Sequence, residues 1–420
     1  MQILIQLSLS LVGGLLLSRL AKKLNLPAVT AYLICGLLLG PYCIGALDLF
    51  SLGFNSAEEV ASLDLVSQVA LGFIAFTIGN EFRLEQLKSM GRQAITVGIL
   101  QAVATTALVD AALIALHFIN PGLISISSAI TLGAIAAATA PAATLMVVRQ
   151  YKADGPLTRL LLLVVAIDDA VGLVLFSASF GVAAALESGA ISLLTVLVEP
   201  LIEIVLSLGL GALAGWVLFW VEKFFHSRSK RLSISIGFVL LTVGLSMMKF
   251  EVGGVHCGFS LLLVCMMTGT LFCNICGFSE ELMARVDGWT APLFVLFFVL
   301  SGAELDLSVL RNPSVLLIGF IYILVRSLGK YVGAYGSCAL SGCGGNITKY
   351  LGITLLPQAG VALGMAITAQ ALTDGAVVRS VVLFSVLVYE LVGPALTKRA
   401  LLAAGEIQPE GRTSARTKNA

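Results

Sequence analysis

Apolar segments of about 20 residues recur along this chain, and they limit what it can fold into. A helix of that length spans the hydrocarbon core of a bilayer, because it rises about 1.5 Å per residue. Of the 420 residues, 58% are hydrophobic and 12% are charged, whereas a soluble protein carries about 25% charged residues. We therefore expect an all-α integral membrane protein. Its net charge of +1 gives no indication of nucleic-acid binding.

The hydropathy pattern predicts about thirteen membrane-spanning helices. No positive charge precedes the first apolar run and no small-residue cleavage pattern follows it. We therefore expect a first membrane helix and not a cleaved signal peptide. The predicted spans are, in order, 2–20, 28–46, 60–80, 94–117, 127–148, 157–182, 194–222, 232–249, 255–273, 287–304, 313–337, 347–371 and 378–402.

The distribution of basic residues predicts how these helices are oriented. The connections after the second, fourth and sixth spans contain no lysine or arginine. Cytoplasmic connections are enriched in both, so we expect the N-terminus outside and the segment from Lys398 onward in the cytoplasm. The connections after the first, third, fifth and seventh spans carry the basic residues Arg19, Lys22, Lys23, Arg83, Lys88, Arg92, Arg149, Lys152, Arg159, Lys223, Arg228, Lys230 and Arg231.

Two pairs of matching segments indicate that the halves of the chain are related. The segment "FTIGNEFRLEQLK" matches "FVLSGAELDLSVLR" with Gly79 on Gly302, and "DDAVGLVL" matches "YELVGPAL" with Asp169 on Glu390. The two matches have nearly equal offsets, so helices 1–6 correspond to helices 8–13 in the opposite orientation. Such inverted repeats are typical of secondary transporters.

A proline interrupts the fifth and the twelfth predicted helix, which are equivalent in this repeat. Pro141 follows Thr139 and Ala140 in "GAIAAATAPAATLMVV", and Pro357 precedes Gln358 in "GITLLPQAGVALGMAI". Proline removes a backbone donor and clashes with the preceding turn, which frees carbonyl groups inside the membrane. A lone proline can simply kink a helix, but the paired positions favour two broken, crossing helices.

Two adjacent aspartates, Asp168 and Asp169, lie within the apolar run "LLLVVAIDDAVGLVLFSAS" of the sixth predicted helix. They are about 17 Å from its start, near the midplane, where an ionised carboxylate costs roughly 3 kcal/mol or more. Adjacent helical side chains point about 100° apart, so one carboxylate can face a cavity while the other meets a partner. A structural polar pair is the alternative, but two acids at this depth favour an ion-binding site.

Few basic side chains can offset this charge. Arg326 and Lys330 lie four residues apart in the eleventh predicted helix and therefore share a face. Lys330 is the deeper of the two and lies in the glycine-rich stretch "SLGKYVGAYG", which suits close packing. Snorkelling to the far interface is the alternative for either side chain. We predict that Lys330 is the charge partner of the acids, with Arg326 and Glu390 as second candidates.

These residues predict exchange of a monovalent cation for protons. Ionised carboxylates bind a hard cation, and neutral ones hold a proton. If both ions compete for Asp168 and Asp169, which titrate as a coupled pair, their exchange across the membrane is antiport. A gated cation channel and a sodium-coupled organic-anion symporter are alternatives, although Lys330 argues against the symporter. The short loops carry no P-loop motif, so a primary pump is unsupported.

The segments "ATAPAATLMVVRQYKADGPLT", "AIDDAVGLVLF", "RSLGKYVGA" and "LLPQAGVALGMA" resemble bacterial sodium/proton antiporters of the monovalent cation:proton antiporter-2 family. The resemblance extends to about Leu402 and implies a multi-pass inner-membrane homodimer without a cofactor besides the transported Na⁺ and H⁺. It implies a core that moves in an elevator-like way against a dimerisation domain. We assign 60–182 and 287–402 to the core, 2–46 and 194–273 to dimerisation, and 403–420 to a short cytoplasmic tail.

The resemblance also implies roles for single residues. Asp169 is then the main Na⁺ ligand, while Asp168 shares in the cation and proton site and pairs with Lys330. Thr139, in the broken helix, lies beside the ion. An acidic pair resembles the electrogenic members of the family, which favours electrogenic exchange of Na⁺ or Li⁺ for protons. Potassium/proton exchange is the alternative within the family, since both cations take oxygen ligands.

The sequence departs from the family pattern at two positions. Ala140 stands where relatives often carry a polar or acidic residue, and Gln358 stands where some relatives have an acid. The short tail also leaves no room for the nucleotide-binding regulatory domain of glutathione-gated potassium efflux systems. That difference disfavours the potassium-efflux alternative.

Overall fold

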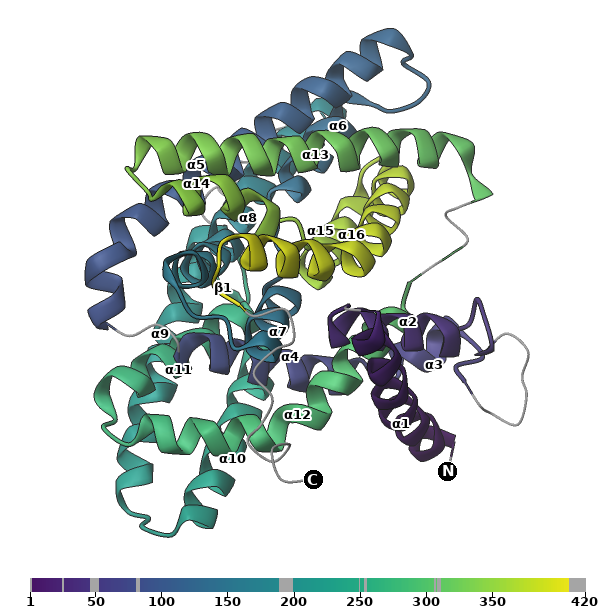
Figure 1. Ribbon diagram of the computed structural model, residues 1–420. Helices are drawn as coiled ribbons and strands as arrows, with labels where there is room; N and C mark the ends of the chain where they lie inside the picture. The colour runs from purple at the N-terminus through teal and green to yellow at the C-terminus, as the bar shows by residue number, and fades with distance from the viewer. Residues whose placement is uncertain are drawn as a thin grey trace. The chain divides into compact units, whose positions relative to one another are not determined.

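The computed structural model describes residues 2–24, 26–45, 53–80, 84–188, 199–248, 250–252, 255–305, 307 and 311–407. Within this part the chain is helical, as predicted, apart from one short hairpin (Figure 1). The hairpin pairs β1 (Phe250–Val252) antiparallel with β2 (Val255–Cys257). It therefore occupies the link between the predicted spans 232–249 and 255–273. Strand β2 takes the place of the first residues of the second of these spans.

Each of the thirteen predicted spans corresponds to one helix or to a broken pair. The fifth is divided into α6 (Ile126–Ala136) and α7 (Pro141–Tyr151), and the twelfth into α14 (Gly345–Thr354) and α15 (Gly360–Thr368), which a 3-10 turn, η4 (Ala369–Ala371), extends. The other helices are α1 (Gln2–Lys23), α2 (Ala28–Leu39), α3 (Ala57–Ala61), α4 (Asp64–Asn80), α5 (Leu84–Ile119), α8 (Pro156–Ser188), α9 (Glu199–Lys223), α10 (Arg228–Ser246), α11 (Leu261–Ile275), α12 (Ser279–Ala303), α13 (Pro313–Leu340) and α16 (Gly375–Ala403).

Local sequence accounts for several of these boundaries. Ser125 and Ser260 accept hydrogen bonds from backbone N–H groups in the first turns of α6 and α11, as N-cap residues do. Asn312 does the same for α13, whose first residue is Pro313. Proline is favoured there because the first N–H of a helix has no partner within the helix.

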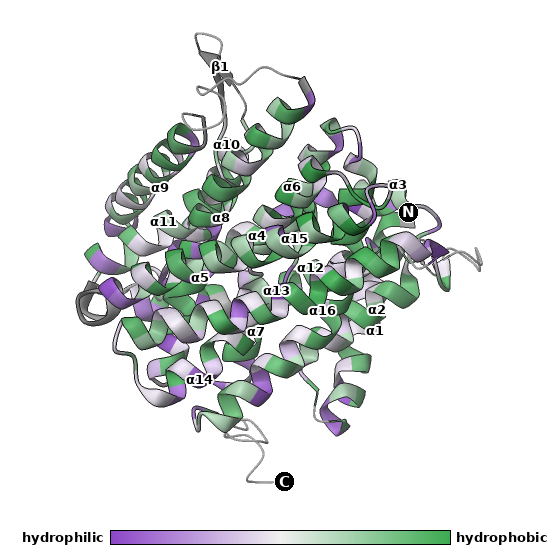
Figure 2. Cartoon of the chain, turned by 90° about the horizontal axis from the view of Figure 1, so that it is seen from above, coloured by the Kyte–Doolittle hydropathy of each residue, from purple (hydrophilic) through white to green (hydrophobic). Residues whose placement is uncertain are grey.

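Eight segments of the described chain are long and apolar enough to cross a membrane, with α6 and α7 counted together as Ile126–Tyr151, and a ninth qualifies if α12, bent by 44°, is one span. Hydrophobic residues, drawn in green, recur along the helices in Figure 2. Shorter apolar helices such as α2, α4 and α11 fall below that length. A multi-pass helical membrane protein is thus supported, while the count of thirteen spans and the orientation of the termini remain predictions.

Contacts between Cα atoms divide the chain into two compact units. Unit 1 comprises Met1–Leu15, Tyr32–Ser89 and Ala184–Leu305, and unit 2 comprises Leu16–Ala31, Met90–Ala183 and Asp306–Ala420. This grouping differs from the sequence-based division at α4 and α12, which had been assigned to the core helices and which lie in unit 1. The first of the two repeat matches includes residues 81–83, 306 and 308–310, and these lie outside the described residues.

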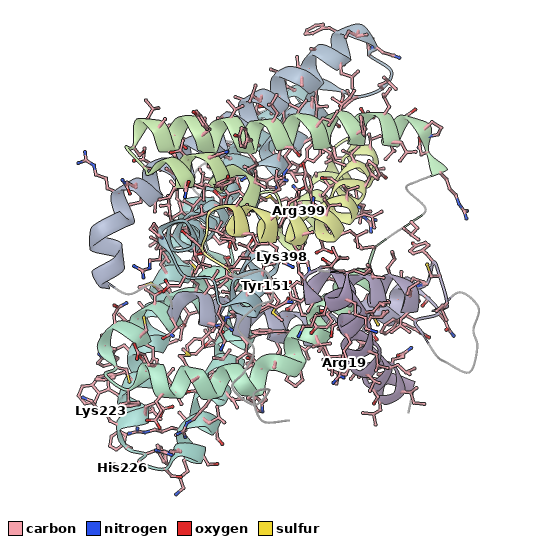
Figure 3. The ribbon with its side chains drawn as sticks, in the orientation of Figure 1. Arg19, Tyr151, Lys223, His226, Lys398 and Arg399 are labelled. Carbon is pink, nitrogen blue, oxygen red and sulfur yellow. The ribbon has the colours of Figure 1, made fainter. Side chains whose placement is uncertain are left out.

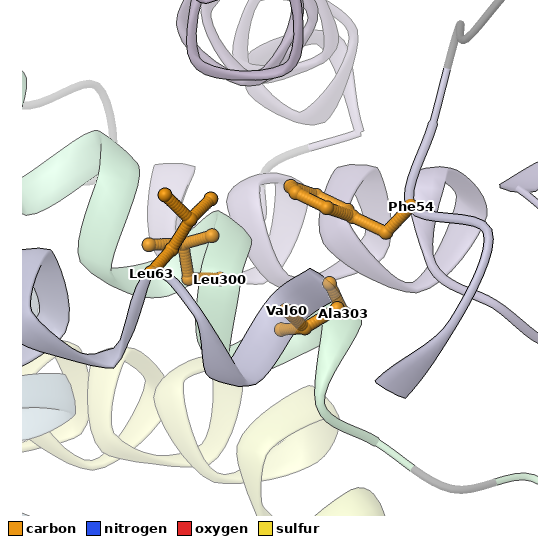
Figure 4. Close-up of a cluster of buried hydrophobic side chains, with 5 residues drawn as sticks. All are labelled: Phe54, Val60, Leu63, Leu300 and Ala303. Atoms are coloured by element: carbon orange, nitrogen blue, oxygen red, sulfur yellow. The ribbon is translucent and has the colours of Figure 1, made fainter. Parts of the chain in front are cut away.

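Glycine contacts explain why α4 belongs to unit 1. A Cβ atom at Gly79 would lie 1.9 Å from the Met266 carbonyl oxygen of α11, and one at Gly269 would lie 2.1 Å from the Phe76 carbonyl oxygen of α4. Small residues of this kind let two membrane helices pack backbone to backbone. Helix α4 also packs on α12. Unit 1 also contains a cluster of buried side chains formed by Phe54, Val60, Leu63, Leu300 and Ala303 (Figure 4).

Helix α16 organises much of unit 2. It packs on α13, α14 and α15, and on both halves of the first broken helix, α6 and α7. Near its C-terminus, the Lys398 ammonium lies 4.7 Å from the centroid of the Tyr151 ring at the end of α7 (Figure 3). The two broken helices are therefore held around one long helix.

The α4–α11 crossing predicts a large effect of a side chain at Gly269. We expect Gly269→Val to destabilise the protein by about 1–3 kcal/mol, because the new side chain meets backbone atoms that cannot rotate away. The matched control is Gly209→Val on α9, where a Cβ atom meets nothing within 4 Å. Thermal unfolding of the two purified variants checks this, and equal melting temperatures would contradict the close contact.

Candidate functional site

Two interrupted helices meet in unit 2. The chain leaves helical geometry between Ala136 and Pro141 and again between Thr354 and Gly360. The Ala140 N–H donates a hydrogen bond of 2.8 Å to the Pro357 carbonyl. Ala140 thus contributes its backbone here and has no side-chain cap for α7. The two extended segments touch, and the ends of four half-helices come together around them.

Arg326 of α13 caps the C-terminal ends of two of these half-helices. Its Nε donates to the Ala136 carbonyl at 3.0 Å, its Nη2 to the Ala138 carbonyl at 2.7 Å, and its Nη1 to the Leu356 carbonyl at 2.8 Å. The side chain is fully buried, and the Tyr389 ring covers it with 4.4 Å between the guanidinium carbon and the ring centroid. A cation is favourable there because carbonyl groups at a helix C-terminus carry partial negative charge.

Lys330 lies one turn further along α13 and is also fully buried. Its ammonium approaches four oxygens: Asp168 Oδ2 at 3.0 Å, Thr139 Oγ1 at 2.9 Å, Gln101 Oε1 at 3.0 Å and the Ala137 carbonyl at 2.6 Å. An ammonium has three N–H donors, so these four acceptors share them. The side chain stays inside the helix bundle and does not snorkel to an interface.

Every oxygen of the Asp168 carboxylate has a donor. Oδ1 accepts from Gln101 Nε2, and Oδ2 accepts from Thr139 Oγ1 at 2.7 Å and from Lys330 Nζ. The carboxylate is 1% exposed. A buried charge is tolerated only when it is paired and hydrogen-bonded, and Asp168 meets both conditions.

Asp169 differs from its neighbour. Its Oδ1 atom is buried and has no hydrogen-bond partner among the described residues. The two adjacent carboxylates thus have opposite environments, one fully bonded and one with an open coordination position. An unsatisfied carboxylate oxygen inside a membrane protein is unfavourable unless a proton or a cation joins it.

Close helix packing explains how Lys330 reaches Gln101. Gly329 and Gly333 flank the lysine four residues apart, and a Cβ atom at either would lie 3.0 Å from backbone atoms of α5, at Thr105 and Gln101. This small-x-x-x-small spacing brings the α13 backbone against α5. Gln101 then bridges the pair, because its amide donates to Asp168 and accepts from Lys330.

Gln358 belongs to a separate polar network in the second break. Its amide nitrogen donates to the Ile135 carbonyl and to the Tyr322 hydroxyl, each at 3.1 Å, and its amide oxygen accepts from Ser385 at 2.8 Å. The side chain is fully buried. These contacts tie the second broken segment to α6, α13 and α16, so Gln358 holds the break in place.

The other predicted site residues are the two prolines, Glu390 and Arg326. Pro141 is the first residue of α7, and Pro357 supplies the carbonyl that bonds to Ala140. Glu390 is 4% exposed on α16. Arg326, a second candidate for pairing with the acids, bonds instead to carbonyl groups.

The chain is similar to known proteins over nearly its whole length. Residues 7–402 match the family described as sodium/hydrogen exchanger, transmembrane. The chain belongs to the sodium/hydrogen exchanger family. The family resemblance inferred from the four quoted segments is therefore confirmed.

Two relatives and two solved structures show how far the likeness of this exchanger extends. It is 25% identical to Na(+)/H(+) antiporter 1 of Methanocaldococcus jannaschii over 349 residues, 79% of the chain and 76% of the relative. It is 29% identical to K(+) efflux antiporter 5 of Arabidopsis thaliana over 92 residues, 22% of the chain and 14% of that relative. Its fold matches a structure of a sodium proton antiporter from Methanocaldococcus jannaschii at pH 8 with a TM-score of 0.70 and 18% identity, over 97% of this chain and 99% of the other. A second structure of that antiporter, from electron microscopy, matches with a TM-score of 0.71 and 19% identity. That match covers 96% of this chain and 98% of the other.

The helix that carries the two aspartates is capped from the far end of the exchanger's sequence. The Glu406 carboxylate accepts from the Leu157 N–H and the Thr158 N–H, each at 2.7 Å, and from the Thr158 hydroxyl at 2.6 Å. These are donors of the first turn of α8, which has no partners of its own for them. Gly405, with φ of 79°, turns the chain after α16 so that Glu406 reaches them.

Sequence reasoning missed Gln101 and Glu406. Gln101 had a visible signal, since an amide in the middle of an apolar membrane helix needs a partner. Glu406 had none, because a glutamate after the last helix looks like any residue of a polar tail. Its importance depends on a contact with residues about 250 positions earlier.

The Arg326 geometry predicts that lysine cannot replace this residue. An ammonium cannot reach three carbonyl groups in the arrangement that the guanidinium fork serves. We expect Arg326→Lys to lose about 2–4 kcal/mol of stability, because each buried acceptor left without a donor costs about 1–3 kcal/mol. The control is Arg159→Lys, which changes a partly exposed ion pair with Asp154 worth at most about 1 kcal/mol. Similar melting temperatures for both variants would rule out the capping role.

Proposed function

We propose that this exchanger is a secondary active transporter that exchanges Na⁺ or Li⁺ for protons across a cell membrane. In this proposal Asp169 is the main cation ligand, and cation and proton compete for the coupled pair Asp168 and Asp169. The observation that carries the proposal is the contrast between the two carboxylates. Asp168 is fully hydrogen-bonded and paired with Lys330, whereas Asp169 has an oxygen that bonds to no residue in the described part of the chain.

The surrounding oxygens suit a monovalent cation. The Thr139 hydroxyl lies next to Asp168, and the first break takes carbonyl groups before Pro141 out of helical hydrogen bonding, where each keeps a second lone pair beside its bond to Arg326 or Lys330. Broken helices of this kind supply carbonyl ligands for Na⁺ in secondary transporters. We assign Thr139 a place beside the ion, because its hydroxyl can turn an oxygen lone pair toward it.

The charge of the site supports an electrogenic cycle. With Lys330 charged and Asp168 ionised, this ion pair is neutral, so a cation or a proton bound at the two acids balances the charge of Asp169. If Lys330 also gives up its proton when the cation enters, more than one proton moves for each cation. Exchange would then carry net charge and respond to the membrane potential.

Unit 2 is the part that we propose to move. It contains Asp168, Asp169, Thr139, Lys330 and both breaks, so the complete ion site would travel as one body in an elevator-type movement. Unit 1 would be the static part and would form the contact between the two copies of a homodimer. We place the protein in the inner (cytoplasmic) membrane of the cell.

Potassium/proton exchange is a second candidate. The match to K(+) efflux antiporter 5 of Arabidopsis thaliana supports it, although the match covers 22% of the chain. Dequenching of a pH-sensitive dye in proteoliposomes, on separate additions of Na⁺, Li⁺ and K⁺, distinguishes the cations. We expect responses to Na⁺ and Li⁺, and a response to K⁺ alone would favour the second candidate.

Asp169→Asn tests the assignment of the cation ligand. A neutral amide neither releases a proton nor offers a negative charge, so we expect the dye response to fall to the level of empty liposomes. Asp154→Asn is the matched control, since that exposed side chain pairs only with Arg159 in the described part of the chain. Full exchange by a folded Asp169→Asn protein would contradict the assignment of Asp169 as the cation ligand.

Lys330→Gln tests the charge pair. Removal of the ammonium leaves Asp168 buried without its ionic partner, and loss of one member of a buried pair typically costs about 3–5 kcal/mol. Without this cation the two acids ionise less readily, so we also expect exchange to require a higher pH. The measurements are the melting temperature, and transport at several pH values with and without a clamped membrane potential. Wild-type behaviour in all three would make Lys330 a bystander.

A further inference from the structure

Another acid lies inside a membrane helix of unit 2, apart from the site described above. Asp110 belongs to α5, whose segment Gly91–Ile119 is a candidate membrane span. It lies nine residues before the end of that helix, or about 14 Å along its axis. The hydrocarbon core of a bilayer is about 30 Å thick, so this depth lies within it. Ionisable residues at such depths generally have a function.

The Asp110 side chain points at the backbone of α6. A Cβ atom at Gly133 would lie 1.8 Å from Asp110 Oδ1 and 3.1 Å from the Thr106 carbonyl oxygen. Only a glycine leaves room for the carboxyl group at this place. The carboxyl group therefore faces the first broken helix and not the lipid.

Two polar atoms at this contact have no partner. Asp110 Oδ1 and Thr106 Oγ1 are both buried and form no hydrogen bond in the described part of the chain. Thr106 is 7% exposed. The two residues are four apart on α5, so their side chains share one face. An acid and a hydroxyl that are both unsatisfied on one face indicate a place for an ion.

No neighbouring charge that the structure describes neutralises Asp110. Helix α6 contains no ionisable side chain between Ile126 and Ala136. On α5 the next ionisable group on the same face is His117, two turns further, whose Nδ1 lies 2.7 Å from the Ile124 carbonyl oxygen. A proton or a small cation would supply the missing interaction, because either one balances the negative charge of the Asp110 carboxylate.

The position of Asp110 links it to the main site. Gly133 lies on α6 about one turn, or roughly 6 Å, before Ala137, the residue that follows the helix, and the Ala137 carbonyl accepts from Lys330. The backbone that Asp110 faces is therefore continuous with the segment that bonds to Lys330. The connection between α5 and α6 carries no basic residue and is predicted to be extracellular, so Asp110 lies on the outer side of Lys330.

We propose that Asp110, with Thr106, forms a second ion-binding site, which holds a proton or a monovalent cation between the outer surface and the Asp168–Lys330 pair. The inference rests on the proposed exchange function and adds a step to it. An ion would pass from the outside to Asp110 before it reaches the main acids. Asp110 would therefore affect exchange when the cation is offered from outside more than when it is offered from the cytoplasm.

Sidedness tests this proposal. Exchange is measured in right-side-out and in everted membrane vesicles for wild type and for Asp110→Asn, with Na⁺ as the probe. We expect the KM for Na⁺ at the outer face to rise by about fivefold or more, the size of a typical coupling between two sites. The KM at the cytoplasmic face should change less. Infrared difference spectra between low and high pH should also lose one protonated-carboxyl C=O component in Asp110→Asn.

Two further variants keep the test decisive if Asp110→Asn does not fold. Gly133→Ala displaces the carboxyl group, and Thr106→Val removes the neighbouring hydroxyl, so both should raise the outer-face KM. The matched control is Thr96→Val, whose hydroxyl on α5 bonds back to the Arg92 carbonyl.

Unchanged KM values at both faces together with an unchanged C=O band, in whichever of these variants fold, would overturn the proposal. The main site would then still stand on the inactivity of Asp169→Asn, and activity of that variant would overturn the exchange mechanism instead.

Discussion

The contact between Lys330 and Asp168 is the interaction on which the rest of unit 2 depends. Both side chains are buried, and neither charge would be stable there alone. The Gln101 amide and the Thr139 hydroxyl bond to both charges, and the Ala137 carbonyl accepts from Lys330. Thr139 and Ala137 are available only because α6 ends at Ala136 and α7 starts at Pro141. The broken helix and the ion pair therefore require one another.

The two cations of α13 bond to different groups. Arg326 bonds to three carbonyl groups from both breaks, and Lys330 bonds to one carbonyl and to the side chains around Asp168. Carbonyl groups freed in the membrane interior would otherwise be unsatisfied. Because Arg326 satisfies the ends of the half-helices, Lys330 is left to neutralise the acid. Asp169 differs, because its Oδ1 atom has no hydrogen-bond partner among the described residues.

Much of this site could be predicted because membrane helices make polar residues conspicuous. Asp168, Asp169, Lys330 and the two prolines stand out against apolar runs, and the structure pairs Lys330 with Asp168 and joins the two breaks at Pro357. The partners were harder to predict. Arg326 reaches carbonyl groups 188 and 190 residues away, and a carbonyl leaves no mark in a sequence. The place of α4 in unit 1 depends on which glycine faces which helix, and apolar segments rich in glycine look alike before they pack.

The cap on α8 has a consequence for the order in which the protein is made. Leu157 and Thr158 find their acceptors in Glu406, which leaves the ribosome roughly 250 residues after them. Until then, the first turn of the helix that carries both aspartates lacks the partner it has in the folded protein. The first turn of α8 therefore gains this cap only when the segment after α16 has been synthesised, so one of the last residues described completes a helix from the first half of the chain.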